Sequence, residues 1–407
     1  MESVNTTKPA TAVTPARLNL VISFFIAAAI YLTFAWLLKM QPGAAGIEQP
    51  DLVFNIDVYQ YVHKLGDLGY QELNSKHLLR MHTWVPLTRM LFPLFDGSPH
   101  EQAVKAAVLF NIITLSLAFT AVSWFALRTL QSLSKVWLLN VVHLLSTSSL
   151  IMSAPDHFSQ SYLLMITAIL SFICIDKLIV LLVVAVILGI LIAGTTTSNA
   201  AFAGLLGYFI LARHFQFKAV FNRLFIVAFL LAPIVGGYLF YLYTREADPN
   251  QFLFLKFFNF RLFNELPSAL VYCLASWVYP IVAPLPELSR SGHITLEPIA
   301  LADFFDWYLI PSAVVLAGIG YGIISHWRKE QMPMLIQILL TWVAFNAIFH
   351  NVWGDEYILF SGHYSFALII LIMLLFKRLT TSHCLAFSVP VIIWQGLFAY
   401  TTFNLIP

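Results

Sequence analysis

Apolar residues fill long, nearly uninterrupted stretches of this chain, and short polar segments separate them. A helix of about 20 apolar residues crosses a hydrocarbon core, so these stretches are predicted to span a membrane. They cover Leu18–Leu38, Ala106–Leu127, Val136–Ala154, Phe158–Ile175, Leu178–Ala193, Ala200–Ala212, Leu224–Tyr243, Trp307–Ser325, Met334–Phe349, Ser365–Phe376 and Leu385–Phe403. The pattern therefore predicts an all-α polytopic membrane protein with about 11 transmembrane helices.

The segment from Asp51 to Phe95 follows the first predicted span and is too polar to enter lipid. It still carries apolar residues at helical spacing, namely Val58, Tyr61, Val62 and Leu65, and then Leu87, Met90, Leu91 and Leu94. Pro86 precedes the second set and is tolerated in the first turn of a helix. We therefore predict two amphipathic helices that lie along the membrane surface in the first outer loop.

Composition agrees with a membrane protein. Hydrophobic residues make up 59% of the 407 residues and charged residues 10%, whereas a soluble domain carries about 25% charged residues. Eleven spans leave no room for a separate soluble domain of ordinary size. The net charge of +2, without a basic cluster, gives no indication of nucleic-acid binding, and we expect none.

Lys and Arg residues predict the orientation, because cytoplasmic loops collect them. With the N-terminus inside, the loops that hold Arg128, Lys177 and Arg213 all fall on the cytoplasmic side. The apolar segment Ala269–Ile281 is ambiguous, since prolines interrupt its end. If it does not cross fully, the Arg328–Lys329 loop also lies inside, so we predict eleven spans with the C-terminus outside.

This topology divides the chain into four parts. Residues 1–17 are predicted to form a disordered cytoplasmic tail, and residues 18–243 an N-terminal transmembrane module whose first outer loop covers 41–105. Residues 244–306 are predicted as an outer region with surface or re-entrant helices. Residues 307–407 form the C-terminal transmembrane helices.

Ionisable residues outside the first loop also fall on the predicted outer face. Asp156 and His157 occupy a Pro-containing turn between two spans, and Glu356 and His363 lie in another short outer segment. Each one alone is more often an interfacial residue that faces water. Their convergence on one face favours a functional site.

Several short motifs then resemble a known family. The run Asp57-Val-Tyr-Gln-Tyr61, followed by Gly69-Tyr70 and Phe92-Pro93-Leu94, resembles the first outer loop of integral-membrane glycosyltransferases of the GT-C fold, in particular the mannosyltransferase-like members. The segments SAPDHFSQSYLLM (Ser153–Met165) and AGTTTSNAAF (Ala193–Phe202) are similar to that family's second outer turn and its Gly-Thr-rich segment. The resemblance covers roughly the first half of the chain.

The resemblance implies a catalytic carboxylate in the first outer loop, and by position this is Asp57. Asp51 is its nearest competitor, although it could instead cap a helix. Sugar transfer also needs positive charge at the leaving phosphate. The candidates for donor-phosphate or substrate binding are Arg80, His82, Arg89, Asp156, His157, Glu356 and His363. For Arg80 and Arg89 the alternative is snorkelling toward lipid headgroups.

The implied partners are a polyprenyl-phosphate-linked sugar donor, a glycan or lipid acceptor and membrane lipids. A divalent metal is compatible with so many outer carboxylates, but no acidic pair has a spacing that identifies a site. We expect a multi-pass protein of a bacterial inner membrane with its active site on the outer face. The rival interpretations are an O-antigen polymerase or ligase and a lipid or solute transporter or flippase.

Overall fold

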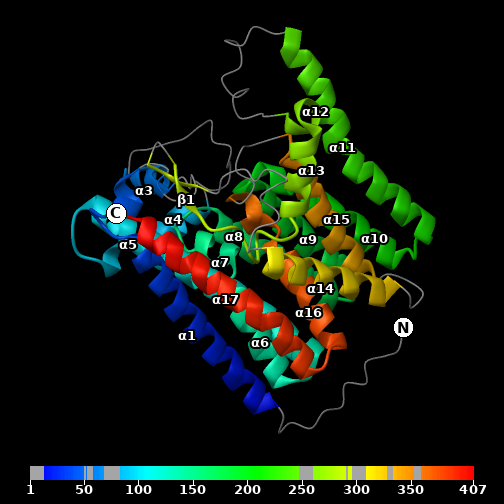
Figure 1. Cartoon of the computed structure of the whole chain (residues 1–407), viewed down its shortest axis with the longest axis horizontal. Coiled ribbons are helices and arrows are strands. Elements are labelled where there is room, and N and C mark those ends of the chain that lie inside the picture. Colours follow the sequence, from blue (N-terminus) through cyan, green and yellow to red (C-terminus); the bar gives the residue numbers. More distant parts are fainter. Residues whose placement is uncertain are drawn as a thin grey trace.

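The computed structural model describes residues 13–49, 52, 58–67, 83–246, 260–289, 292–295, 309–327, 333–352 and 359–407. In these residues the chain folds into a helical bundle with one small two-stranded sheet (Figure 1). The all-α prediction is therefore correct apart from this sheet.

Five of the described helices are long and apolar enough to cross a membrane. They lie within α1 (Val13–Leu37), α5 (Pro99–Leu130), α9 (Leu178–Thr195), α11 (Ala219–Glu246) and α17 (Thr381–Leu405). One face of α17 exposes large apolar side chains one turn apart, at Leu385, Val389, Ile393 and Leu397. Such a face is unfavourable in water and fits contact with lipid, so these helices fit a membrane protein.

Shorter helices account for the other predicted spans. These are α6 (Leu133–Leu144), α8 (Phe158–Cys174), α10 (Ala200–His214), α14 (Leu309–Trp327), α15 (Met334–Phe349) and α16 (Ser365–Arg378). Several are near or below the length that a full crossing needs. The membrane character is thus supported, whereas the number of eleven crossings stays a prediction.

The predicted span Val136–Ala154 is not one continuous helix. The helix ends at Leu144, and a second, short helix, α7, covers Thr147–Met152. The physical reason is a helix cap, since the Ser146 hydroxyl accepts a hydrogen bond from the backbone N–H of Ser149 at 3.3 Å. These residues therefore do not form one continuous helix, and their crossing of the membrane stays a prediction.

The ambiguous segment Ala269–Ile281 contains only a short helix, α13 (Leu266–Ala275), which follows α12 (Arg261–Asn264). Ten residues of helix are about 15 Å long, which is half of a hydrocarbon core. The chain then continues without helix and is buried at Tyr279, Ile281 and Ala283. This arrangement fits the predicted re-entrant segment.

Side chains from other helices satisfy the backbone of this buried segment. Gln395 Nε2 donates to the Ile281 carbonyl at 2.9 Å, and Trp394 Nε1 donates to the Ala283 carbonyl at 2.7 Å. The backbone N–H of Ser148, at the start of α7, donates to the Pro280 carbonyl at 3.0 Å. The break between α6 and α7 thus makes room for irregular backbone, which a membrane protein tolerates where the protein buries it.

The first loop contains α2 (Ala45–Glu48), α3 (Val58–Gly66), α4 (Trp84–Arg89) and the short 3₁₀ helix η2 (Phe92–Leu94). In α3 the predicted apolar residues Val58, Tyr61, Val62 and Leu65 are all buried, which confirms this amphipathic helix.

The apolar residues predicted for the second helix of the loop are not buried in the bundle. Leu87, Met90 and Leu94 are exposed, and Val85 and Thr88 are buried instead. Burial of Thr88 is tolerated because its hydroxyl donates to the Trp84 carbonyl at 2.8 Å and lies 3.5 Å from the Tyr61 hydroxyl. The exposed residues then suit contact with the apolar edge of a membrane.

The region after α11 also meets the first loop. Strands β1 (Glu287–Leu288) and β2 (Ile294–Thr295) pair antiparallel, and the N–H of Ile294 donates to the Leu52 carbonyl at 2.8 Å. The β1–β2 hairpin of the later outer region therefore contacts the first loop at Leu52.

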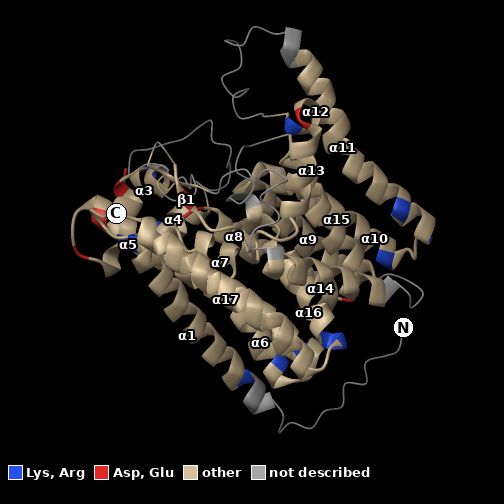
Figure 2. Ribbon diagram, in the orientation of Figure 1, with Lys and Arg blue, Asp and Glu red and all other residues tan. Residues whose placement is uncertain are grey.

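The two ends of the bundle differ in charge (Figure 2). Most Lys and Arg residues gather where α1 and α11 begin and α10 and α16 end, whereas Asp and Glu residues gather near α3. Several basic side chains bond the carbonyls of helix C-termini, which carry partial negative charge. Arg213 donates to the Phe172 carbonyl at 2.5 Å, and Lys135 to the Phe376 carbonyl at 3.1 Å. The C-terminus lies at the opposite end, beside α3 (Figure 1).

Candidate functional site

A layer of buried polar side chains lies where α7, α8 and α9 meet the short helices η3 (Thr197–Asn199) and η7 (Leu359–His363). Apolar surroundings normally exclude such groups unless they are hydrogen-bonded or functional. We call this set the polar layer, and its members are Ser153, Asp156, His157, Ser159, Gln160, Ser161, Thr195, Thr196, Asn199, Ser361, His363 and Ser365.

Asp156 and His157 form the acidic and basic centre of the polar layer. Asp156 Oδ1 lies 2.7 Å from His157 Nδ1 and also accepts a hydrogen bond from the His157 backbone N–H at 2.6 Å. Both residues are buried, so the carboxylate orients the imidazole in a region that excludes most water. This pair can hold or transfer a proton at the other imidazole nitrogen.

A side chain of α5 fixes the turn before this pair. The Asn111 amide donates to the carbonyls of Met152 and Ser153 at 2.8 and 3.2 Å. Asn111 is buried and belongs to α5, the most buried of the five long helices. The position of the turn therefore depends on the position of α5.

His363 is distant from Asp156 and His157 in the sequence but lies close to His157 in the structure. Its Nδ1 lies 3.1 Å from Asn199 Nδ2, and its ring centroid lies 5.7 Å from that of His157. The Trp342 indole donates to the His363 carbonyl at 2.9 Å and so fixes the backbone of η7. The structure thus brings the predicted residues Asp156, His157 and His363 together.

A close approach of two backbones makes this convergence possible. A Cβ atom added to Gly362 would lie 2.9 Å from Phe158 Cβ, which is closer than side chains tolerate. Glycine at this position lets η7 pack directly on the start of α8.

Helix α4 of the first loop contacts the polar layer. Trp84 Nε1, from α4, donates to the Thr195 hydroxyl at 2.7 Å, and the Ser161 hydroxyl lies 3.3 Å from that of Thr196. Three segments that were singled out separately in the sequence therefore touch one another.

Some polar atoms of the layer have no hydrogen bond to the part of the chain that the structure describes. They are Ser159 Oγ, Gln160 Oε1, Ser361 Oγ and Ser365 Oγ. Buried hydroxyls and amides in this state are suited to bind the hydroxyl groups of a polar ligand. Chemically, the layer offers hydroxyls, two amides and two imidazoles close to one carboxylate.

Arg89 lies elsewhere and has a structural role. Its guanidinium donates to the carbonyls of Leu65, Lys64 and Asp67 at 3.1, 3.3 and 2.8 Å. These carbonyls belong to the C-terminal end of α3 and its continuation, where a cation is favourable. Arg89 therefore joins α4 to α3, and its predicted contact with a donor phosphate stays a prediction.

The remaining predicted residues lie outside the described residues. They are Asp51, Asp57, Arg80, His82 and Glu356. Their roles therefore rest on the sequence alone.

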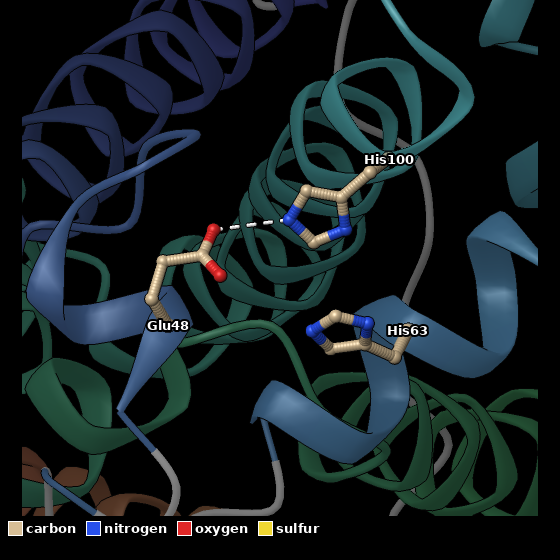
Figure 3. A group of neighbouring side chains, drawn as sticks. All are labelled: Glu48, His63 and His100. Atoms are coloured by element: carbon tan, nitrogen blue, oxygen red, sulfur yellow. Dashed lines mark hydrogen bonds and ion pairs between the residues drawn. The ribbon is translucent and has the colours of Figure 1, made fainter.

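A second cluster, which the sequence did not reveal, contains the residues best suited to a metal ion. Glu48, His63 and His100 come from α2, α3 and α5, and one ligand atom of each lies within 4.8 Å of the others (Figure 3). The His100 Nε2 lies 3.0 Å from Glu48 Oε1, and this hydrogen bond lowers the pKa of the Glu48 carboxyl below its ordinary value. No motif links these positions, because each lies in a different segment of the chain.

No protein-family model, curated protein or solved structure matches this chain.

Proposed function

We propose that this protein is a membrane glycosyltransferase that moves a sugar from a polyprenyl-phosphate carrier to a glycan or lipid acceptor. The observation that supports the proposal best is the contact between the three segments that resemble the GT-C family. Trp84 of the first loop bonds Thr195 of the Gly-Thr-rich segment, and Ser161 of the second outer turn lies beside Thr196. These three segments can contribute to one site only if they lie close together.

The reaction proposed for this site is an inverting transfer. The acceptor hydroxyl oxygen attacks the anomeric carbon, and the bond from that carbon to the phosphate oxygen breaks. Asp57 takes the proton of the acceptor hydroxyl as general base, and the carrier leaves as polyprenyl phosphate. The hydroxyls of Ser159 and Ser361 and the amide of Gln160 are available to bind the sugar hydroxyls.

His157 and His363 are the described groups suited to the phosphate side of the reaction. Their rings lie in one buried region, with centroids 5.7 Å apart, and a protonated imidazole stabilises developing negative charge. The Asp156 carboxylate, 2.7 Å from His157 Nδ1, fixes the orientation of the imidazole ring.

We further propose that the reaction takes place on the outer side of the membrane. The Lys- and Arg-rich end of the bundle is then cytoplasmic, as the positive-inside rule requires. The first loop, the polar layer and the β1–β2 hairpin lie toward the other end. A lipid-linked donor suits this side, because it needs no cytosolic nucleotide sugar.

The experiment that tests the function compares purified wild-type protein with Asp57→Asn and Asp51→Asn in lipid nanodiscs. Polyprenyl-phosphate hexoses and pentoses serve as donors, and both donor binding and sugar transfer are measured. Loss of a positioned general base typically lowers the rate about a hundredfold to ten-thousandfold. Asp57→Asn should therefore lose transfer and keep donor binding.

Asp96→Asn is the matched control, because Asp96 is an exposed residue of the same loop. If Asp57→Asn transfers sugar at the wild-type rate, Asp57 is not the base. A loss confined to Asp51→Asn would move the base to that residue. Absence of transfer and of donor binding in wild-type protein, with every donor, would contradict the proposed function.

A further inference from the structure

We infer that Glu48, His63 and His100 form a binding site for a divalent transition metal, and that Zn²⁺ is the ion that suits it best. The site does not depend on the proposed sugar transfer. It would join α2, α3 and the start of α5 into one unit (Figure 3).

The carboxylate ligand is held in place before any metal binds. Glu48 Oε1 accepts a hydrogen bond from the backbone N–H of Gly43 at 3.2 Å, besides its contact with His100. Gly43 has a φ of +74°, a backbone conformation that glycine adopts without strain. A Cβ at Gly46 would lie 2.1 Å from the Leu38 carbonyl oxygen, so α2 packs tightly on the end of α1.

His100 is equally well fixed. It stands in the first turn of α5, within a capping box in which Ser98 and Glu101 bond each other's backbone N–H. The Ser98 hydroxyl accepts from the Glu101 N–H at 3.3 Å, and Glu101 Oε2 accepts from the Ser98 N–H at 3.0 Å. This cap determines where α5 begins and therefore where the His100 ring lies.

His63 comes from the last turn of α3, and ring contacts hold it against its partner. Its ring centroid lies 4.7 Å from that of His100 and 4.1 Å from that of Tyr59. The cap that Arg89 provides for α3 keeps this end of the helix in place. The three side chains point toward one another, as Figure 3 shows.

The donor set selects the metal. Two imidazole nitrogens and one carboxylate suit Zn²⁺ and other first-row divalent ions, whereas Mg²⁺ and Ca²⁺ prefer oxygen ligands alone. Three protein ligands leave a fourth position of a tetrahedral zinc ion open. Since Glu48 and His63 are exposed, that position can take water or an anionic group such as a phosphate oxygen.

Only small movements are needed to close the site. Ligand atoms of a tetrahedral zinc ion lie about 3.3 Å apart. The Glu48–His100 pair is already at 3.0 Å, and all three atoms lie within 4.8 Å of one another. A change of about 1.5 Å in the position of the His63 ring therefore completes the set, which an exposed side chain can make by a small torsional adjustment.

Zinc binding to the full-length protein tests this inference. The protein is purified with a tag that contains no histidine, treated with a chelator and incubated with Zn²⁺ alone. Bound metal after gel filtration is measured by mass spectrometry, and affinity by titration. We expect one tightly bound Zn²⁺ per wild-type chain, and a rise in melting temperature when Zn²⁺ is added.

The variants are Glu48→Gln, His63→Gln and His100→Gln. Loss of a group that merely supports a metal ligand already costs about tenfold to a hundredfold in affinity, so loss of a ligand should cost at least a hundredfold. His214→Gln and Glu265→Gln are matched controls, since both residues are exposed and distant in sequence from the cluster. They should bind Zn²⁺ as the wild type does.

X-ray absorption of the zinc-loaded wild type gives a second measurement that needs no variant. Two imidazole ligands and an oxygen should appear in the first coordination sphere at about 2.0 Å. Sub-stoichiometric zinc in the wild type, unchanged affinity in all three variants, or a sphere without imidazole would overturn the inference. Because none of these readouts involves sugar transfer, failure of the proposed function leaves this result unaffected.

Discussion

The indole N–H of Trp84 donates a hydrogen bond of 2.7 Å to the hydroxyl of Thr195, a residue 111 positions later in the chain. The same hydroxyl donates to the Leu191 carbonyl at 2.8 Å, so it both accepts and donates a hydrogen bond. This bond ties the short helix α4 of the first loop to the end of α9.

Replacement of Trp84 by Phe should weaken the closure of the first loop. A buried hydrogen bond contributes about 1 kcal/mol, so the melting temperature of the purified protein should fall. Trp36→Phe is the matched control, because the Trp36 side chain is exposed on α1. A double-mutant cycle with Thr195→Val should give a coupling energy of about 1 kcal/mol, and additive effects would show that the bond contributes nothing.

Replacement of Arg89 by Lys should loosen α3 although the charge is kept. A single ammonium group cannot reach the Leu65, Lys64 and Asp67 carbonyls in the way that the planar guanidinium does. Protection of the α3 amides from hydrogen exchange should fall about tenfold, which corresponds to about 1.4 kcal/mol.

Arg128→Lys serves as the control for this exchange measurement, because Arg128 stacks on Trp124 at the other end of α5. If Arg89→Lys leaves α3 protected but reduces binding of a polyprenyl-phosphate sugar, Arg89 contacts the donor, as the sequence predicted. Loss of protection without an effect on donor binding assigns it to α3 alone.

Replacement of Gly362 by Ala should destabilise the polar layer. The new methyl group would lie 2.9 Å from Phe158 Cβ and 3.3 Å from Met152 Cγ, so η7 must move away from α8. Such overpacking typically costs about 1–3 kcal/mol.

Gly396→Ala is the matched control for that substitution, because nothing lies within 4 Å of a Cβ at Gly396 in α17. Alanine inside a helix is favoured over glycine by about 1 kcal/mol, so this variant should be as stable as the wild type or more stable. Equal melting temperatures of the two variants would contradict the close packing of η7.

Single cysteines in a chain without its three native cysteines test the orientation. Asp96 and Ser134 flank the two ends of α5, and Asn404 lies near the end of α17. An impermeant thiol reagent should label positions 96 and 404 from the outside of the membrane and position 134 only after lysis. Labelling of positions 96 and 134 from the same side would exclude α5 as a crossing helix and the predicted topology with it.

Hydrophobic spacing predicted the first-loop helix α3 correctly because one strongly apolar face, with Val58 and Val62, opposes a polar one. For α4, spacing did not predict which side chains the bundle buries. Its sequence has apolar residues on both sides, and Thr88, whose hydroxyl is hydrogen-bonded, lies on the buried side. Spacing alone carries no information about such a polar preference.

The sequence contains a feature that indicates the break between α6 and α7, but a hydropathy pattern does not detect it. Ser146 and the hydroxyl residues after it can cap a helix, and the Ser149 N–H does bond the Ser146 hydroxyl. The Glu48, His63 and His100 cluster had no such signal, because packing of α2 and α3 against α5 creates it. The predicted topology placed Asp156, His157 and His363 on one face of the membrane. It did not predict the close approach of Gly362 to Phe158.

His100 and Asn111 are eleven residues apart on α5, a separation of about three turns and about 16 Å along the axis. The two side chains therefore project from nearly the same side of one rod. His100 reaches the carboxylate of Glu48, and Asn111 carries the turn that precedes Asp156. Sliding of α5 along its axis displaces both residues in the same direction, so the position of the Asp156–His157 pair within the bundle is coupled to that of Glu48 in the first loop.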